Sequence, residues 1–310
     1  MKNAIIISNP IAGIKNDRRS SQIQEAVAVL RKGGINAELQ FTASPGDGKK
    51  LAAEAAASGC DLIIACGGDG TINEVINGLA PGRTPLAILP GGTANIAAKE
   101  LGLSGNIVRA ARQISTCRPF RIPLGRATWE ESGITQQRYF LAVAGIGLDA
   151  HIISQLDVGI KLRIGVLAYV WEAVRQIFRY EFPPFKFNAD SNAASATFAV
   201  VQRSGRYAGW LKLARTHSIR DLGFSCCLFE GHGPGRYFRY ALGILTQTHD
   251  RLHGVRFLSG SDIRCTCDQP RTAIGFEVDG ELAGRIPVTF DVVPDALTIL
   301  APESFCRSQQ

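Results

Sequence analysis

The chain has 310 residues, of which 45% are hydrophobic and 20% charged. This composition is typical of a globular protein, and the length is sufficient for two domains with separate cores. No stretch approaches the ~20 apolar residues of a membrane-spanning helix, and the apolar run at residues 4–8 is too short for a signal peptide, so we expect a soluble, cytoplasmic protein.

The net charge of +7 arises in one region. Residues 151–260 hold 14 Lys+Arg against 7 Asp+Glu, whereas the remainder holds 20 of each. A basic face attracts anionic lipid headgroups or nucleic acid, and it can also be a plain solvated surface. We recognise no nucleic-acid-binding module, so we expect no nucleic-acid partner.

The first part of the chain alternates predicted strands and helices. Residues 4–8 and 36–41 are predicted strands, and helices are predicted over 19–32 and up to residue 58. Thr42 directly follows the second strand. Ligands of open α/β sheets gather at the carboxyl ends of strands, although Thr42 could instead cap the next helix.

The segment 62–78, LIIACGGDGTINEVING, is the most informative stretch. Residues 62–66 form a short apolar run typical of a strand buried on both faces, and Gly67, Gly68 and Gly70 then break it. Thr71 and Glu74 have the spacing of a capping box ahead of apolar residues at helical spacing. A strand, a glycine turn and a helix N-terminus together predict an anion-binding site.

Asp69 lies inside this predicted anion site, where a carboxylate would repel phosphate. A bound Mg²⁺ or a donor group of a nucleotide would resolve that conflict. The alternative is that Asp69 only orders the turn through its own side chain.

A second turn of the same type follows residues 85–89, the fourth predicted strand. Pro90-Gly91-Gly92-Thr93-Ala94-Asn95 repeats the order of strand, glycines, hydroxyl and helix, with Thr93 as a candidate donor to phosphate. Four such strands predict a parallel sheet with right-handed crossovers. The P-loop, protein-kinase and G-x-G-x-x-G dinucleotide motifs are absent.

From about residue 121 the pattern changes to short β-like runs, which predict an antiparallel sandwich. We therefore expect an α/β domain with the predicted anion site over residues 1–122, to which the tail 295–310 could return, and a β-rich second domain over 123–294. Residues 160–178 are predicted to form an amphipathic helix, either at a bilayer surface or packed on the core. The predicted strands are 139–144, 196–202, 224–229, 254–258, 273–278 and 286–292.

The GGDGTINEVINGL run resembles the diacylglycerol kinase catalytic family, which includes sphingosine and ceramide kinases and is distantly similar to NAD kinases. Further matches are the Asn9-to-Gly13 turn, the GGTAN turn, the G-x-G-x-D-A turn ending at Asp149-Ala150, and VDGE at 278–281. Ile96 stands where many bacterial members have aspartate, and we interpret it as a packing residue of the helix. The resemblance covers nearly the whole chain and implies a parallel Rossmann-like, nucleotide-binding α/β domain over residues 1–122, followed by a β-sandwich, lipid-substrate domain over 123–294.

The resemblance also implies the residues of the site. Ser218, Asp221 and Gly223 match a Mg²⁺-binding loop, with Asp221 as the charged ligand. Asp279 and Glu281, two carboxylates one residue apart that could share one face, match the acidic hairpin, where Glu281 accepts a proton and Asp279 orients it or assists the metal. Nucleotide contacts fall to Asn9, Thr42, Gly67, Gly68, Asp69, Gly70, Thr71, Asn73, Gly92 and Thr93.

The expected function is ATP- and Mg²⁺-dependent phosphorylation of a lipid hydroxyl in the cleft between the domains, with diacylglycerol converted to phosphatidic acid in phospholipid metabolism. The alternatives are a sphingosine- or ceramide-type kinase, an NAD kinase, and a non-catalytic regulator that binds lipid or nucleotide. A lipid substrate implies peripheral contact with the anionic inner-membrane surface. The exact lipid and the oligomeric state, a homodimer included, stay open.

Overall fold

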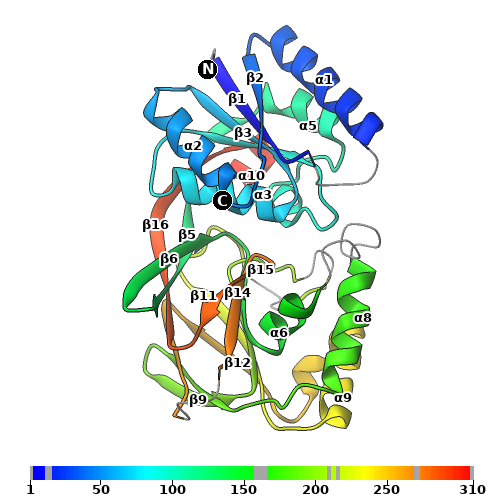
Figure 1. Cartoon of the computed structure of the whole chain (residues 1–310), viewed down its shortest axis with the longest axis vertical. Helices are drawn as coiled ribbons and strands as arrows, with labels where there is room; N and C mark the ends of the chain where they lie inside the picture. The colour runs from blue at the N-terminus through cyan, green and yellow to red at the C-terminus, as the bar shows by residue number, and fades with distance from the viewer. Residues whose placement is uncertain are drawn as a thin grey trace. The chain divides into compact units, whose positions relative to one another are not determined.

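The computed structural model describes residues 3–10, 16–156, 166–207, 211–213, 217–268 and 273–307 (Figure 1). Residues 11–15 of the first predicted turn and the start of the predicted helix 160–178 lie outside the described residues. The chain forms two compact units, Met1–Pro123 with Pro294–Gln310, and Leu124–Val293.

The first unit is built on the parallel sheet that the apolar runs predict. The predicted strands are confirmed as β1 Asn3–Ser8, β2 Asn36–Phe41, β3 Leu62–Gly67 and β4 Leu86–Pro90. They pair in parallel in the order β2-β1-β3-β4, and the end of β16 (Val288–Ala301) joins β4 in parallel through Ile299 and Leu86. The end of the chain therefore returns to this sheet.

Helices cover both faces of this sheet because alternate strand residues are apolar on each face. Helices α1 (Asn16–Lys32) and α5 (Ile107–Ile114) contact each other over Ile6, Ile64 and Leu89. Helices α2 (Asp47–Ala57) and α3 (Asp69–Leu79) contact each other and lie against strands β1 and β3. The shorter helices are α4 Ile96–Glu100 and α10 Glu303–Arg307.

The second unit is an antiparallel β-sandwich, as predicted. One sheet has the order β12-β11-β10-β7-β14-β15, and its partner layer is formed by β5, β6, β8, β9, β13 and the first part of β16. Apolar side chains from the two layers, such as Ile146, Phe187 and Phe290, share one buried core. The bounds are β5 Arg118–Glu131, β6 Ile134–Phe140, β7 Val143–Gly147, β8 Phe185–Ala189, β9 Asn192–Ala196, β10 Phe198–Gln202, β11 Phe224–Phe229, β12 Val255–Gly260, β13 Asp262–Thr266, β14 Gly275–Val278 and β15 Glu281–Arg285.

The glycine-rich segment 144–150 is not the simple turn that the sequence predicts. Residues 143–147 are β7, a buried strand between β10 and β14, and α6 (Leu148–Gln155) follows directly. Gly145 has no room for a side chain because an added Cβ would lie 2.4 Å from Asp149 Oδ2. Gly147 turns the chain into the helix at a φ of 88°.

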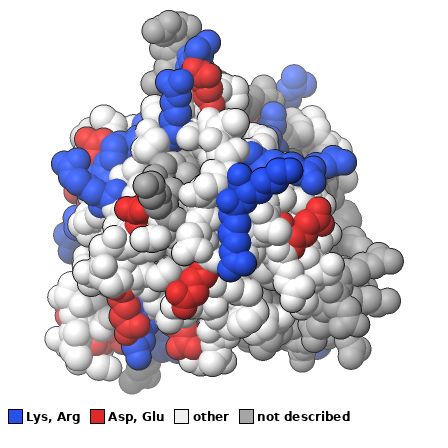
Figure 2. All heavy atoms as spheres, turned by 90° about the horizontal axis from the view of Figure 1, so that it is seen from above, with Lys and Arg blue, Asp and Glu red and all other residues white. Residues whose placement is uncertain are grey.

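Three further helices belong to the second unit: α8 (Val166–Ile177), α9 (Pro234–Leu245) and the 3₁₀ turn His249–Arg251. Among the described residues, no helix is both long and apolar enough to cross a bilayer. On the face shown in Figure 2, lysine and arginine side chains lie among aspartates and glutamates over a largely uncharged surface.

Candidate functional site

The predicted nucleotide residues of the first unit lie at one edge of its sheet. In the parallel register, Ser8 at the end of β1 pairs with Phe41 and Cys66, and Gly67 pairs with Pro90. Asn9, Thr42 and the two glycine turns therefore leave the sheet at the same carboxyl edge. This is the edge at which open α/β sheets bind ligands.

The two glycine turns are in direct contact. The Gly91 amide donates to the Gly67 carbonyl at 2.8 Å, and a Cβ added to Gly92 would lie 2.5 Å from Gly68 Cα. A Cβ added to Gly67 would lie 2.6 Å from Thr71 Cβ. The contact between the turns, and the fit of Thr71 beneath the first one, therefore require glycine at these positions.

Asp69 connects the two turns through backbone amides. Its carboxylate accepts hydrogen bonds from the amides of Asn95 (2.9 Å) and Ile96 (2.7 Å) at the start of α4. Asn95, at a φ of 49°, closes its own turn by accepting from the Gly92 amide at 2.9 Å. These bonds explain, without a bound Mg²⁺, why a carboxylate lies in the predicted anion site. They also mean that the first amides of α4 already have a hydrogen-bond partner.

The capping box predicted from Thr71 and Glu74 is wrong. Helix α3 begins at Asp69 after Gly68, and the Glu74 carboxylate instead accepts from the amides of Gly46 (2.8 Å) and Gly48 (2.9 Å) at the start of α2. Spacing alone could not separate the two roles because α2 and α3 become neighbours only in the fold. The N-cap residue of α3 is Gly68, which makes no side-chain cap bond, so the N-cap does not compete with an anion for the first amides of this helix.

Arg19 is a residue of this site that the sequence patterns did not reveal. Its Nη1 donates to the Gly91 carbonyl at 2.7 Å and its Nη2 to the Cys66 carbonyl at 3.5 Å, while the side chain is only 8% exposed. A Cβ on Gly91 would lie 2.5 Å from Nη2. The available signal was an arginine at the start of the helix that follows the Asn9-Pro10 turn, and helical periodicity assigned it no role.

The remaining predicted nucleotide residues differ in exposure. Thr93 is exposed, whereas Thr42 and Thr71 are buried at 7% exposure. Asn73 is buried inside the turn of α3, where its Oδ1 accepts from Asn77 at 3.2 Å. Ile96 is buried, in agreement with its predicted packing role.

In the second unit, the acidic hairpin has two carboxylates: one is exposed, and the other accepts hydrogen bonds from backbone amides. Asp279 and Gly280 form the turn between β14 and β15 with φ of 49° and 84°. The Asp279 carboxylate accepts from three successive amides, those of Leu141 (2.8 Å), Ala142 (2.8 Å) and Val143 (3.1 Å). Glu281 is exposed at the start of β15. The two carboxylates therefore do not share a strand face, because Asp279 lies in the turn.

A buried carboxyl group, Glu277, lies beneath this hairpin and was missed by the sequence analysis. It is 1% exposed, and its Oε2 accepts from the Gly280 amide at 2.7 Å. Burial raises the pKa of Glu277 well above its ordinary value, and the nearby negative charge of Asp149 adds to this effect. Asp149 is also buried and accepts from the Tyr207 hydroxyl at 2.9 Å. The only sequence signal was a carboxylate within an apolar strand.

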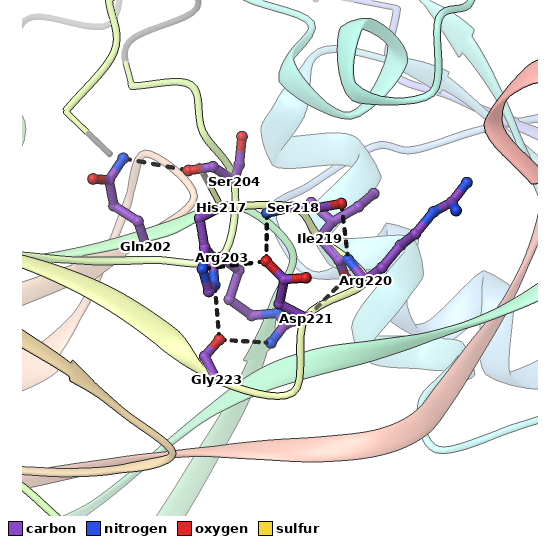
Figure 3. Close-up of polar contacts among 9 residues, drawn as sticks. All are labelled: Gln202, Arg203, Ser204, His217, Ser218, Ile219, Arg220, Asp221 and Gly223. Carbon is purple, nitrogen blue, oxygen red and sulfur yellow. Dashed lines mark hydrogen bonds and ion pairs between the residues drawn. The ribbon is translucent and has the colours of Figure 1, made fainter. Parts of the chain in front are cut away.

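The predicted metal loop is closed by donors from the chain itself (Figure 3). Asp221 Oδ2 accepts from the Ser218 amide at 2.8 Å and lies 3.3 Å from His217 Nδ1, and the Ser218 carbonyl accepts from the Asp221 amide at 2.9 Å. The Gly223 carbonyl accepts from His217 Nε2 at 2.9 Å and from Arg203 Nη1 at 3.4 Å.

Arg203 also donates from Nη2 to the Ile219 carbonyl at 2.7 Å, and its side chain is fully buried. Burial lowers its pKa to about 10, against the opposing effect of Asp221 and Asp279. An ion held by Ser218, Asp221 and Gly223 would compete with these donors for the same oxygens. As the side chains lie, the loop does not fit Mg²⁺.

Both units match known protein families. Residues 3–127 match the diacylglycerol kinase catalytic domain, and residues 142–301 match the YegS C-terminal NAD kinase beta sandwich-like domain. The diacylglycerol kinase of Bacillus subtilis (strain 168) is 27% identical over 297 residues, covering 94% of this chain and 93% of that protein. The diacylglycerol kinase of Staphylococcus aureus (strain MRSA252) is 25% identical over 312 residues, covering 99% and 95%.

Two solved structures have a similar fold. A diacylglycerol kinase from Bacillus anthracis str. Sterne superposes with a TM-score of 0.76 at 23% identity and covers 98% of each chain. Yeast NADH kinase complexed with NADH superposes with a TM-score of 0.50 at 11% identity, covering 97% of this chain and 83% of that one. At these identities the likeness concerns the fold alone.

The parallel α/β unit with its paired glycine turns, the β-sandwich and the matching domain models together define a lipid kinase. The chain belongs to the diacylglycerol kinase catalytic family.

Proposed function

We propose that this lipid kinase transfers the γ-phosphate of ATP to the free hydroxyl of diacylglycerol and releases phosphatidic acid and ADP. The observation that carries the proposal is the geometry at the carboxyl edge of the first unit's sheet, where the sequence predicts an anion site. There, two glycine turns touch, the N-cap of α3 is a glycine, and the positively charged side chain of Arg19 is buried against both turns. Relatives named diacylglycerol kinase support the choice of lipid.

In this proposal the amides of Gly68, Gly70 and Thr71 and the exposed Thr93 hydroxyl bind the phosphates, with Gly67 and Gly92 allowing close approach. Arg19 stabilises the carbonyl sides of both turns and so holds their amides in place. Asn9 and Thr42 lie at the same sheet edge and contact the rest of the nucleotide. Asp69 and Asn73 position the turns and α3 rather than touching ATP.

Magnesium enters as the ion carried by ATP, where it offsets charge on the transferred phosphoryl group. The Ser218–Gly223 loop has no part in this step. Its role as a metal site stays a prediction, one that the donors from His217 and Arg203 argue against.

Glu281 is proposed as the general base. Its exposed carboxylate would take the proton of the lipid hydroxyl as the hydroxyl oxygen bonds to the γ-phosphorus and the bond to ADP breaks. Asp279 acts as a positioning residue because its three backbone hydrogen bonds hold the hairpin that presents Glu281. Since ATP is an intracellular substrate and diacylglycerol a membrane lipid, we place the enzyme in the cytoplasm with peripheral contact to the inner membrane surface.

The test combines product analysis with one pair of variants. The protein is incubated with labelled ATP, Mg²⁺ and mixed lipid extract, and the labelled product is identified by mass. A labelled product that is phosphatidic acid supports the proposal. A labelled phosphosphingoid lipid or phosphoceramide, or labelled NADP when NAD is supplied, would show that the substrate is a sphingoid lipid, ceramide or NAD instead of diacylglycerol.

Glu281→Gln should lower turnover about 10²–10⁴-fold while ATP binding is retained, because general-base assistance is typically worth that range. Glu131→Gln, an exposed carboxylate of β5, is the matched control and should keep full turnover. Unchanged turnover in Glu281→Gln would exclude Glu281 as the base.

A further inference from the structure

Exposed apolar side chains gather on one helix of the second unit. In and directly after α8, Trp171, Val174 and Phe178 are 70%, 40% and 65% exposed. Their spacing of three and four residues places them on one helical face. The side chains of Glu172, Gln176 and Ile177 are buried on the opposite side.

Helix α9 has the same organisation. Phe238, Leu242 and Leu245 are 53%, 53% and 48% exposed at a spacing of four and three, while Tyr237 and Tyr240 are buried. Helices α8 and α9 contact each other, and in Figure 1 α9 lies at the lower end of α8. We call the six exposed residues the α8/α9 apolar face: Trp171, Val174, Phe178, Phe238, Leu242 and Leu245.

The concentration of these residues is unusual for a solvated surface. Among the described residues, eleven large hydrophobic side chains are exposed, and six of them belong to the α8/α9 apolar face. Single exposed apolar residues are normal, but apolar residues grouped on the exposed faces of two helices in contact mark a surface that another body covers.

The charges beside this face indicate what covers it. Arg175 and Arg179 are exposed on and just after α8, and Arg236 and Arg239 are exposed on α9. Within α8 the single acidic residue, Glu172, is 7% exposed and pairs with Arg175, and the α9 sequence contains no acidic residue. After α8, the exposed Glu181 follows Arg179. A second copy of the same face would bring like charges together, which opposes self-association.

We propose that the α8/α9 apolar face docks on an anionic phospholipid bilayer, an inference that rests on the proposed action on a membrane lipid. Aromatic and aliphatic side chains would enter the boundary between headgroups and acyl chains, and the arginines would contact lipid phosphates. Arginine suits this place because its alkyl stem can lie along the apolar surface while the guanidinium stays at the headgroups.

The test uses the full-length chain and co-sedimentation with vesicles. Wild-type protein should bind vesicles of equal phosphatidylglycerol and phosphatidylcholine at least about tenfold more tightly than pure phosphatidylcholine vesicles. The double variant Phe238→Ser, Leu242→Ser should bind the anionic vesicles at least about tenfold more weakly. Ile134→Ser, which replaces an apolar residue of β6 that is 62% exposed, is the matched control and should bind like wild type.

A second variant tests the charge separately. Arg236→Gln with Arg239→Gln should weaken binding to anionic vesicles and leave the weak binding to neutral vesicles unchanged. All variants should melt at the wild-type temperature because the replaced side chains are exposed.

Anionic-vesicle binding by the Phe238, Leu242 variant at wild-type strength would overturn the proposal. So would a wild-type dimer that this variant converts to a monomer, since the face would then lie between two copies of the chain, and so would failure of the wild type to bind anionic vesicles at all.

Activity separates this inference from the proposed function. On a short-chain diacylglycerol dissolved as monomers, the Phe238, Leu242 variant should retain wild-type turnover, whereas on vesicle-embedded diacylglycerol it should lose activity in proportion to binding. Face-dependent vesicle binding without phosphorylation of either substrate by wild type would refute the proposed function and leave the docking face supported.

Discussion

Replacing Gly92 by alanine tests the contact between the two glycine turns. The added Cβ would lie 2.5 Å from Gly68 Cα, whereas non-bonded carbon atoms sit about 3.5–4.0 Å apart. The turns must therefore separate by roughly 1 Å. Backbone cannot rotate away as a flexible side chain can, and the Gly91 amide bond to the Gly67 carbonyl restrains the same place.

We expect this displacement to lower kcat/KM for ATP by about 10²-fold, because an error of 1 Å in the placement of binding groups can cost that much. The free energy of unfolding should fall by about 1–3 kcal/mol, as for other overpacked sites. Calorimetry of ATP binding and turnover assays measure the loss of kcat/KM, and a denaturant melt measures the loss of stability.

Gly105→Ala is the matched control in the same unit. No atom lies within 4 Å of its added Cβ, so its affinity and turnover should equal those of wild type. If Gly92→Ala binds ATP and turns over like Gly105→Ala, the phosphates do not depend on the contact between the turns, and the anion site has been placed wrongly.

Two further predictions concern the second unit. Because burial raises the pKa of Glu277, the folded state holds a proton that the unfolded chain releases, so stability falls as pH rises from the ordinary glutamate pKa toward the raised one. Glu277→Gln should therefore gain stability relative to wild type with increasing pH, by at most about 1.4 kcal/mol per pH unit in denaturant melts from pH 5 to 8; a constant difference would contradict this. For the Ser218–Gly223 loop, Mg²⁺ without ATP should leave the wild-type Tm unchanged but raise that of His217→Ala, which removes one partner from Asp221 and one from Gly223. An equal rise in both proteins would show that wild type already binds the ion there.

The strands and turns of the first unit were predictable because their signals are local. An apolar run of five or six residues that ends in glycines specifies a buried strand and its turn without reference to distant residues, and residues 62–70 form both. The hairpin at Asp279-Gly280 is predictable in the same way, since its turn requires positive φ at two positions.

The partners of the polar side chains were not predictable. The Glu74 carboxylate binds amides 28 and 26 residues earlier in the chain, and Asp69 binds amides 26 and 27 residues later. Short polar strands such as β9 and β15 have too little apolar alternation to be recognised, and they form because neighbouring strands supply the hydrogen bonds.

The sequence by itself determined the two-part architecture, the glycine turns and the family, because all three follow from patterns within about twenty consecutive residues. Only the tertiary structure decided that Asp69 joins the two turns, that Arg19 lies against them and that His217 and Arg203 close the predicted metal loop. Such roles depend on which distant backbone groups a side chain meets, and hydrogen bonds act only over about 3 Å, so they exist only once the chain has folded.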